Sequence, residues 1–386
     1  MPTKKFRVLL TGGGTGGHVY PLIAVAAELQ IIAGEKNMDT DIRYLGAFGP
    51  FKELFEINNI KVGRVAESKL RRYFSFRNFI DVPKFAYSIL QAAFKMYWFM
   101  PDVVFSKGGP GALAVVLAAR FYMIPVIIHE SDSVPGLTNL ISGKFAKVVA
   151  TSFESVSEYF PGKEIVLTGN PIRRYMLKDL DKESVERNKG FLGFDPSLPL
   201  ITVMGGSQGA SAFNDFVLGH LSDLLNITQV LHQTGTANYD DVIKRLETSA
   251  AGIDEDLLKR YRPIPYLKDD LRATLVASEL VVSRSSAGSV FELAAFGKPS
   301  ILIPLPADVA AGDHQTKNAS DYCKTGAAVM ITQGEMPGRL LTEIQRLLGN
   351  PADLSEMSKA ATGFSRPEAA LNIAKIILRL GGYGQS

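Results

Sequence analysis

KKFRVLLTGGGTGGH, residues 4–18, decides the fold of the first half of this chain. Its apolar run, 6–11, predicts a buried β-strand, and the glycines that follow predict a tight turn. The pattern over 22–32 then predicts an amphipathic helix. A buried strand, a glycine turn and a helix in this order open a Rossmann-like α/β unit. A second opening of the same kind begins near Leu200 and runs into GGSQGA, residues 205–210.

Short β-branched runs recur along the chain and alternate with longer helical patterns. Apolar runs of this kind are typical of strands buried on both faces of a parallel sheet. The predicted fold class is therefore α/β, with doubly wound parallel sheets. The predicted strands are 6–11, 42–45, 103–106, 126–129, 147–151, 165–168, 200–204, 229–233, 280–283 and 300–304.

The two glycine-turn openings predict two Rossmann-like domains. The segment 178–189 is dense in charge and loses apolar periodicity, so we expect the boundary near it. The first domain is predicted to span 1–170 and the second 171–365. Pro367 suits the first turn of a helix, and the C-terminal helix within 366–386 is expected to pack back onto the first domain.

Composition excludes several classes of protein. The chain has 386 residues, of which 46% are apolar and 21% charged, which argues against a disordered, collagen-like or coiled-coil protein. The net charge of +3 divides into +5 for residues 1–170 and −2 for 171–386. Cys323 is the single cysteine, which excludes an internal disulfide and suits a reducing compartment. No signal peptide and no membrane-spanning run of about 20 apolar residues is expected, so the sequence predicts a soluble, cytoplasmic-type protein.

The first glycine loop is a candidate anion site. Glycines let backbone amides approach an anion closely, and a helix N-terminus adds a favourable partial charge. Gly12, Gly14 and Gly17 also fit the dinucleotide pattern G-x-G-x-x-G, which requires an acid at the end of the next strand. Neither 44–47 in the first half nor 232–235 in the second supplies one. A nicotinamide or flavin site is therefore disfavoured.

His18 is the first candidate for chemistry. It stands where the glycine loop becomes a helix, at the carboxyl end of a strand, where open α/β sheets bind ligands. A neutral imidazole accepts a proton from a hydroxyl nucleophile at neutral pH. A lone histidine is more often structural than catalytic, and only its position favours a direct role.

The second half repeats the anion-binding pattern. The amides of 205–210 and of 284–289 can each meet a phosphate. Glu292 follows on the same helix and can accept two hydrogen bonds from a ribose diol. The alternative is a capping box, with Ser289 as the cap and Glu292 three residues on. The segment 313–318 offers polar side chains for sugar hydroxyls, or a solvated helix start.

Together these segments resemble the bacterial peptidoglycan N-acetylglucosaminyltransferases, the MurG family within glycosyltransferase family 28. The resemblance implies a GT-B fold, in which two Rossmann-like domains face a cleft. It further implies inverting transfer of GlcNAc from UDP-GlcNAc to the C4 hydroxyl of the MurNAc unit of lipid I, forming lipid II. The resemblance covers nearly the whole chain and rests on residues 11–21, 129–130, 135–139, 169–173, 205–210 and 284–292.

The same resemblance implies where the donor binds. Ser207 and Arg173 would meet the diphosphate, and Glu292 the ribose. Arg284 would lie near the uracil, with the 267–271 stretch. The other donor-binding residues that it implies are Thr15, Gly16, Gly17, Gln208 and Ser289, with Gln315 and Asn318 on the GlcNAc hydroxyls. Placed amides and Arg173 would stabilise the leaving diphosphate, so no cofactor and no metal is expected. Asp254-Glu255-Asp256 is better explained as an exposed acidic helix start.

On the acceptor side the chain departs from the family pattern. The usual G-G-Y/F-x-S-x-P is here Gly108-Gly109-Pro110-Gly111-Ala112, without the aromatic residue and the serine. The usual H-E-Q-N ends here in Ser131-Asp132, and His314 replaces the first glutamine of the sugar-binding pair. The acceptor-side residues implied are Gly14, Gly108, Gly109 and Asn139.

These departures leave the general base open. His18 is the first choice, Glu130 the second, and Asp132 a candidate that this sequence adds. His129 ends a buried-looking strand, so we expect it to be structural.

A basic and aromatic segment over 69–99 predicts contact with a membrane. Ten aromatic residues fall within the 27 positions 73–99, where the average composition gives two or three. Aromatic residues rimmed with cations fit interfacial binding to anionic lipid, although core packing of a helix over 85–100 explains part of them. The predicted location is the cytoplasmic face of the cell membrane, peripherally bound, with no nucleic-acid partner. The cations are Lys69, Arg71, Arg72, Arg77, Lys84 and Lys95.

Three other functions remain open from the residues alone. One is a related GT-B transferase that acts on another lipid or polyprenyl acceptor. Another is a UDP-GlcNAc 2-epimerase, which shares the two-domain architecture and needs no lipid. The third is a non-catalytic nucleotide-sugar sensor, which leaves His18 and Glu130 without a task.

Overall fold

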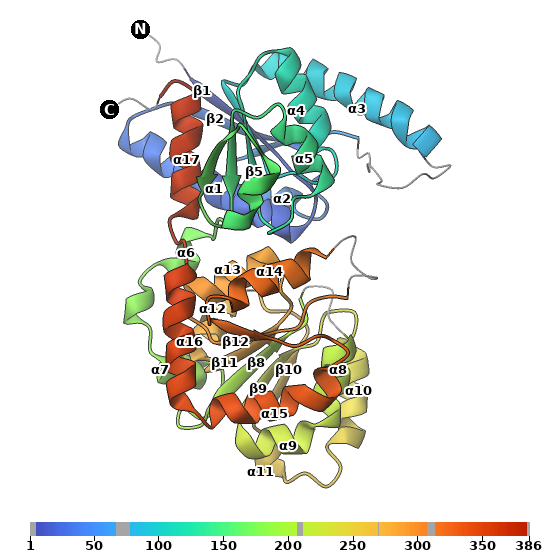
Figure 1. Cartoon of the computed structure of the whole chain (residues 1–386), viewed down its shortest axis with the longest axis vertical. Helices are drawn as coiled ribbons and strands as arrows, with labels where there is room; N and C mark the ends of the chain where they lie inside the picture. The colour runs from blue at the N-terminus through green and yellow to red at the C-terminus, as the bar shows by residue number, and fades with distance from the viewer. Residues whose placement is uncertain (1–4, 67–77, 207–210, 269, 307–312, 384–386) are drawn as a thin grey trace. The chain divides into compact units, whose positions relative to one another are not determined.

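The computed structural model describes residues 5–66, 78–206, 211–268, 270–306 and 313–383 of the chain (Figure 1). The chain divides into two compact units, and each is described by itself below. Unit 1 contains Met1–Tyr175 and Arg366–Ser386, and unit 2 contains Met176–Ser365. The first division falls five residues after the predicted one, so that Arg173 belongs to unit 1 rather than to the expected donor domain.

Unit 1 is built on a seven-stranded sheet in the order β3-β2-β1-β4-β5-β6-β7, with every neighbouring pair parallel. Its helices include the 3-10 helix η1. The strands are β1 (Phe6–Thr11), β2 (Thr40–Gly46), β3 (Lys61–Arg64), β4 (Val103–Ser106), β5 (Val126–Glu130), β6 (Val148–Thr151) and β7 (Glu164–Leu167). The helices are α1 (Gly16–Glu35), α2 (Lys52–Ile57), α3 (Asn78–Phe99), α4 (Ala112–Phe121), α5 (Leu137–Gly143), η1 (Glu154–Tyr159), the short α6 (Arg174–Leu177), which crosses into unit 2, and α17 (Ala369–Leu380).

The core of unit 1 joins the two ends of the chain. Apolar residues of β1 and α1 pack with Ile373 and Ile377 of α17 in one buried cluster. Figure 1 shows α17 beside α1. A side chain at Gly381, just after α17, would strike the ring of Phe6 at 2.3 Å. The C-terminal helix is therefore part of the first unit's core.

Helix α1 corrects the expectation that the chain has no apolar run of about 20 residues. Among the described residues it is long and apolar enough, by length and composition, to cross a membrane. Its most apolar 18-residue window is 56% buried within the structure, and Val19, Leu22 and Val25 are completely buried. Burial of this kind is that of a core helix, which lies against the sheet of unit 1.

Unit 2 is built on a six-stranded parallel sheet in the order β10-β9-β8-β11-β12-β13. The strands are β8 (Leu200–Met204), β9 (Gln229–Gln233), β10 (Tyr261–Ile264), β11 (Leu280–Ser283), β12 (Ser300–Leu302) and β13 (Ala328–Met330). The helices are η2 (Leu180–Lys182), α7 (Val185–Phe191), α8 (Ser211–Gly219), α9 (Leu221–Ile227), α10 (Tyr239–Ser249), α11 (Glu255–Leu258), α12 (Leu271–Ala277), α13 (Ala287–Ala295), α14 (His314–Cys323), α15 (Met336–Leu348) and α16 (Pro351–Phe364). Both sheets confirm the predicted α/β class.

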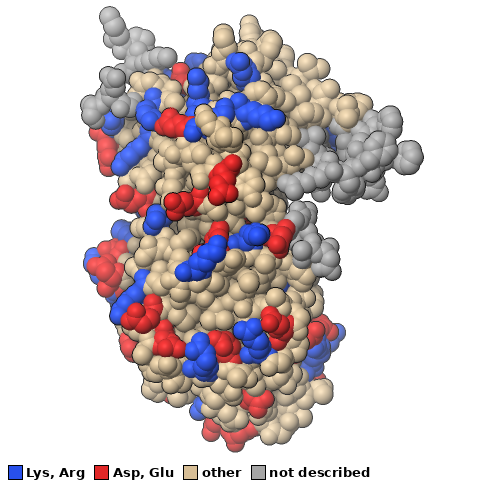
Figure 2. Space-filling model, viewed as in Figure 1, with Lys and Arg blue, Asp and Glu red and all other residues tan. Residues whose placement is uncertain are grey.

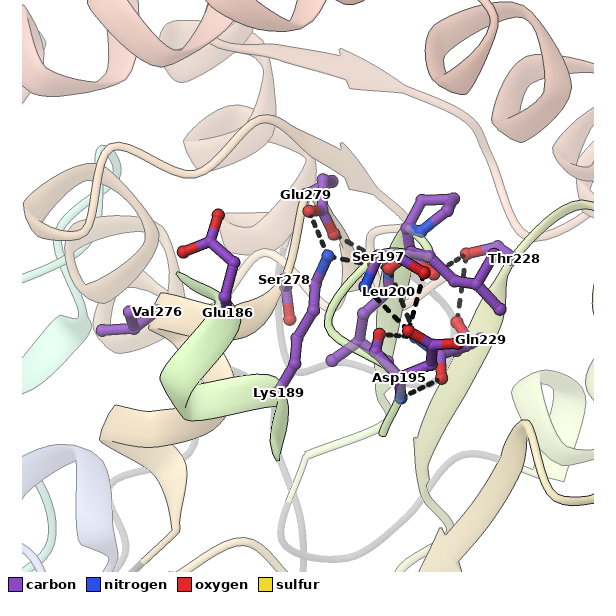
Figure 3. A network of polar contacts seen from close by, with 12 residues as sticks. Glu186, Lys189, Asp195, Ser197, Leu200, Thr228, Gln229, Val276, Ser278 and Glu279 are labelled. Carbon is purple, nitrogen blue, oxygen red and sulfur yellow. Dashed lines mark hydrogen bonds and ion pairs between the residues drawn. The ribbon is translucent and has the colours of Figure 1, made fainter. Parts of the chain in front are cut away.

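A polar network fastens the start of unit 2 to the amino end of its sheet (Figure 3). The buried Lys189 of α7 donates to the carbonyl of Leu198 at 2.8 Å and to Glu279 Oε1 at 2.6 Å. Glu279 Oε2 also accepts from the backbone N–H of Leu200, the first residue of β8, at 2.7 Å. Nearby, the Gln229 side chain bonds the backbone of Asp195 in both directions. The network therefore lies at the amino end of the sheet. Ligands bind in this fold at the opposite end, the carboxyl edge.

Candidate functional site

In unit 1 the candidate site is centred on the contact between two glycine loops, one after β1 and one after β4. Gly109 follows β4 with a φ of +87°, and a side chain there would lie 2.9 Å from the Cα of Gly13 and 3.0 Å from His18 Nε2. Gly14 has the same constraint, because a Cβ at that position would meet the backbone of Gly49 at 2.8 Å. Since β1 and β4 are neighbours in the sheet, the two loops lie together at its carboxyl edge. The close contacts explain Gly13, Gly14 and Gly109 without any ligand, whereas a Cβ at Gly17 would meet nothing within 4 Å.

His18 lies in this contact, in the first turn of α1. Its Nδ1 is 2.8 Å from the hydroxyl of Thr15, and Thr15 is the extended residue that precedes the helix. Burial, helped by the nearby Lys107, lowers the pKa of His18 to about 4, against an opposing effect of Asp132. The imidazole is therefore neutral at physiological pH and is able to accept a proton.

Lys107 is the centre of a buried network that sequence reasoning missed. It directly follows β4 and is only 2% exposed. Its ammonium donates to His129 Nδ1 at 2.6 Å, to Asn170 Oδ1 at 3.1 Å and, at short range, to the hydroxyl of Ser131. Burial lowers the pKa of Lys107 to about 7, although Glu130 and Asp132 oppose this. A lysine directly after a short buried strand, VVFS, is the sequence signal that would have found it.

Glu130 has a structural task. It is 4% exposed. Its Oε1 accepts from the N–H of Asp132 at 3.0 Å, and its Oε2 from the N–H of Gly136 and the amide of Asn139, at 3.2 and 2.9 Å. Burial and the neighbouring Asp132 raise the pKa of Glu130. These bonds shape the loop between β5 and α5, and a carboxylate so engaged is a poor second choice as the base.

Two further residues fix the same loop. His129 is fully buried, and its Nε2 lies 2.9 Å from the carbonyl of Gly169 while Nδ1 faces Lys107. Burial holds the pKa of His129 well below its usual value, so the ring is neutral and has the structural place expected of it. Asn139 donates to the carbonyl of His129 and packs against Gly108, where a Cβ would lie 2.6 Å from its Oδ1.

Arg173 lies against the second turn of α1 in unit 1. Its guanidinium carbon is 4.4 Å from the centre of the Tyr20 ring, in α1, and 5.1 Å from that of Tyr175. The adjacent Arg174 pairs with the buried Glu28 of α1 at 3.3 Å. These contacts place Arg173 with α1, which is why it belongs to unit 1.

In unit 2 the candidate donor residues lie beyond the carboxyl ends of β11 and β12. Arg284 donates to the carbonyls of Ile303 and Pro304, both at 3.1 Å, and to Gln333 Oε1 at 2.7 Å. It is 9% exposed and stacks over the Phe213 ring. These contacts link the ends of β11 and β12 through Arg284. The expected place of Arg284 beside uracil stays a prediction.

The start of α13 corrects the predicted capping box. Ser286, not Ser289, is the N-cap, and its hydroxyl accepts from the N–H of Ser289 at 3.3 Å. Glu292 therefore lies six residues after the cap and takes no part in a capping box, which needs three. It is partly exposed on α13. The alternative explanation for Glu292 is wrong, and the ribose diol remains a prediction.

The sugar-binding candidates fall on α14. Gln315 Oε1 accepts from the N–H of Leu305 at 3.0 Å, and Gln315 is partly exposed. Asn318 is completely buried and donates to the carbonyl of Ser285 at 3.2 Å. Its burial shows that Asn318 is not part of a solvated helix start, whereas the other residues of 313–318 are partly or fully exposed. Its contact with a GlcNAc hydroxyl stays a prediction. His314, in place of a glutamine, is the first residue of α14.

The last two donor candidates, Ser207 and Gln208, lie outside the described residues. The acidic segment 254–256 lies at the start of α11. Asp254 caps α11 by accepting from the N–H of Asp256 at 2.8 Å, and Asp256 pairs with Lys259. The acidic segment is thus the exposed helix start that the sequence predicted.

Two family models match most of the chain. Residues 8–151 match the glycosyltransferase family 28 N-terminal domain, and 200–373 match its C-terminal domain. Over 339 residues the chain is 35% identical to the UDP-N-acetylglucosamine--N-acetylmuramyl-(pentapeptide) pyrophosphoryl-undecaprenol N-acetylglucosamine transferase of Clostridium perfringens (strain SM101), with 88% of each chain covered.

The chain belongs to glycosyltransferase family 28. The enzyme is similar over its length to the crystal structure of Acinetobacter baumannii MurG, with a TM-score of 0.74, 26% identity, and 97% and 99% of the two chains covered. The GT-B fold and the predicted glycosyltransferase class are thereby confirmed. A UDP-GlcNAc 2-epimerase from Neisseria meningitidis, solved with UDP-GlcNAc, shares the fold alone, with a TM-score of 0.68, 14% identity, and 97% and 100% of the chains covered.

Proposed function

We propose that this transferase moves GlcNAc from UDP-GlcNAc to the C4 hydroxyl of the MurNAc unit of lipid I, with inversion, and so forms lipid II. The family relationship across 88% of the chain carries the proposal. The glycine loop after β1 and the glycines Gly205 and Gly206 after β8 each lie at the carboxyl edge of a parallel sheet. They support the proposal because this edge is where such sheets bind ligands.

The reaction needs a base, an acceptor hydroxyl and a leaving group. His18 takes the proton of the C4 hydroxyl, whose oxygen attacks C1 of GlcNAc while the bond from C1 to the diphosphate oxygen breaks. The electron pair leaves with UDP. The departing diphosphate gains negative charge, and backbone amides of the second glycine loop and Arg173 are the groups that we assign to its stabilisation.

The donor site in unit 2 is assigned to the carboxyl edge of its sheet. Glu292 of α13 is placed on the ribose diol, where a carboxylate accepts both hydroxyl hydrogens. Gln315 keeps its place near the GlcNAc hydroxyls, since it is partly exposed at the start of α14. Asn318 and Arg284 are assigned to the support of this edge, because both are buried and bonded to backbone carbonyls.

Incubation of the enzyme with UDP-GlcNAc alone tests this function against the epimerase. We expect no UDP-ManNAc, and release of UDP that becomes substantial only when lipid I is added. Proton NMR of the donor, followed over many enzyme equivalents, measures both. Rapid conversion of the donor without acceptor would favour an epimerase or hydrolase and refute the transferase proposal.

Helix α3 supplies the surface that we propose for membrane contact. Its residues Ser88, Ala92, Met96 and Phe99 face the core, spaced as one side of a helix. On another side lies a second apolar row, the α3 row, which is 58–73% exposed. The α3 row consists of Tyr87, Leu90, Phe94, Tyr97 and Trp98.

The exposure of the α3 row needs an explanation, because soluble surfaces rarely show such a cluster of large apolar side chains. In Figure 2 the surface over α3 is mostly free of charged side chains. Phe121 and Met123, at and just after the end of α4, are exposed as well. Insertion of these side chains into the interface of a bilayer would remove them from water.

Cations flank the α3 row, as expected for an anionic lipid surface. An open cavity of about 410 Å³ is lined by Arg64, Lys84 and Lys95, together with Ala66 and Gln91. Lys95 also donates to the carbonyl of Arg64 at 2.6 Å, which joins β3 to α3. The proposed location is the cytoplasmic face of the cell membrane, with peripheral binding. The remaining cations of this prediction, with Tyr73, Phe74 and Phe76, lie outside the described residues, and the Phe79 side chain is likewise not described.

Replacing both Phe94 and Trp98 with serine tests the membrane surface. We expect about tenfold weaker partitioning onto vesicles that contain anionic phospholipid, because two largely exposed rings no longer leave water. Sedimentation with liposomes measures the partitioning. The control variant replaces Ile57 and Phe191, which are 77% and 70% exposed on other helices, and should bind as the parent does. Equal partitioning of all three proteins would contradict the proposal.

A further inference from the structure

We propose that Tyr20 is a positioning residue for the leaving diphosphate, because its ring holds the face of the Arg173 guanidinium and leaves the N–H edge of that group open to an oxyanion. The inference rests on the proposed function, in which Arg173 stabilises the departing diphosphate. Both residues belong to unit 1. Tyr20 has no other task in the reaction described above.

Two aromatic rings contact Arg173. Its guanidinium carbon lies 4.4 Å from the centre of the Tyr20 ring and 5.1 Å from that of Tyr175. A cation within about 6 Å of a ring centre is attracted by the negative face of the ring. Tyr20 gives the shorter contact and is half-buried in the long helix α1, whereas Tyr175 is 56% exposed. The Tyr20 ring is therefore the main support of the guanidinium.

Other contacts fix the Tyr20 ring itself. A side chain at Gly16, the first residue of α1, would lie only 3.1 Å from Tyr20 Cε2. The Phe51 ring, directly before α2, meets the Tyr20 ring edge-on, with the ring centres 5.8 Å apart and the planes at 74°. The ring is thus packed against the start of α1 and the segment before α2, and it presents a fixed surface to Arg173.

The neighbouring Arg174 is fastened to the same helix in a different way. It pairs with Glu28 of α1 at 3.3 Å, and Glu28 is only 6% exposed. Glu28 follows Tyr20 by about two helical turns. Two consecutive arginines are therefore held on α1, one by a carboxylate and one by a ring. The carboxylate neutralises the charge of Arg174, whereas a ring leaves the charge of Arg173 in place.

A ring contact also leaves the hydrogen-bond donors of an arginine available. The five N–H groups of a guanidinium lie in its plane, so a ring against its face uses none of them. In the part of the chain that the structure describes, the Arg173 guanidinium makes no hydrogen bond and no ion pair. Arg284, in contrast, uses its donors on the carbonyls of Ile303 and Pro304 and on Gln333. Arg173 keeps the planar set of donors that binds two phosphate oxygens at once.

A guanidinium that is already held stabilises an anion better than a mobile one. An ordered arginine side chain loses less conformational freedom when the anion binds. The charge that develops on the departing diphosphate then meets a group that needs no rearrangement. The Tyr20 ring should therefore add to the affinity for the diphosphate only through Arg173.

A double-mutant cycle on UDP binding tests the inference without any acceptor. In isothermal titration, Tyr20→Leu should weaken UDP binding about three- to tenfold, since the ring contact is lost. Tyr20→Phe keeps the ring and should restore most of the affinity. Arg173→Ala should itself bind UDP more weakly, and in that background Tyr20→Leu should cause no further loss. A merely structural role of Tyr20 would give the same loss in both backgrounds.

Two further comparisons isolate the ring contact. Uridine, which lacks the diphosphate, should bind Tyr20→Leu and the parent equally well. Trifluorophenylalanine in place of Tyr20 keeps the shape of the ring but removes its negative face. It should bind UDP more weakly than Tyr20→Phe does, even if Tyr20→Leu fails to fold. Tyr159→Leu, which removes a 45% exposed ring from η1, is the control and should bind UDP as the parent does.

Three results would overturn the inference. These are unchanged UDP affinity in Arg173→Ala, an equal loss from Tyr20→Leu in both backgrounds, and equal UDP affinity of Tyr20→Phe and the trifluorinated protein. All of them concern UDP alone and are independent of transfer to lipid I. The expected cycle in an enzyme that transfers nothing to lipid I would support the ring contact and refute the proposed function.

Discussion

His18→Ala is expected to lower the turnover of GlcNAc transfer by about 10²–10⁴-fold, the contribution typical of a general base. Without the imidazole, the C4 hydroxyl must lose its proton to water while it attacks. The measurement is kcat with saturating UDP-GlcNAc and lipid I at pH 7.5. Donor affinity should remain close to that of the parent, because no donor contact is assigned to the His18 side chain.

A matched control separates this effect from a general loss of folding. His220 immediately precedes α9 in unit 2 and stacks on Phe216, and His220→Ala should keep nearly full turnover. Asp132→Asn should lose far less turnover than His18→Ala if Asp132 only supports the base. Full activity of His18→Ala at neutral pH would exclude His18 as the general base and favour Asp132 among the other candidates.

Glu292→Ala is expected to weaken UDP-GlcNAc binding by about 1.5–3 kcal/mol, since hydrogen bonds to a charged group are lost. Isothermal titration of the enzyme with donor or with UDP measures the change. Glu356→Ala, on the exposed face of α16, is the control and should bind normally.

A deoxynucleotide sharpens the assignment of Glu292. If the carboxylate holds the ribose diol, the parent enzyme should bind 2′-deoxy-UDP more weakly than UDP, and Glu292→Ala should no longer distinguish them. Retained discrimination by the variant, or unchanged affinity for the donor, would remove Glu292 from the site.

The interior strands were predictable from the sequence, and three of the edge strands were not. The predicted bounds of β1, β4, β8, β9 and β11 agree with the structure residue for residue. Each has apolar residues at its centre and, except for Arg7 in β1, is buried along its whole length. The strands that the sequence did not reveal are β3, β10 and β13, and each ends a sheet. An edge strand has one neighbour and more solvent, so KVGR and YRPI carry little of the apolar pattern. AVM is apolar but only three residues long, which is too short to mark a strand.

The glycine turns and His18 were predictable because a strand, a turn and a helix occur in sequence order. Lys107 and Arg284 were not, for a common reason. Both carry charge at the end of a buried strand, and their bonding partners lie 22–63 and 19–49 residues away. From the sequence, a charged residue at such a position suggests contact with a ligand. In the structure, its charged group instead bonds to distant residues of the same protein. Asn318 is uncharged, but it too is buried and bonds to a distant residue, the carbonyl of Ser285.

Transfer of labelled GlcNAc from UDP-GlcNAc to purified lipid I tests the central claim most directly. The enzyme in detergent micelles should give a labelled lipid product only when both substrates are present. NMR of that product should show a β-1,4 linkage to MurNAc, the inverted configuration of the donor's sugar. No lipid product from folded enzyme that binds UDP-GlcNAc, or a linkage of retained configuration, would contradict the account.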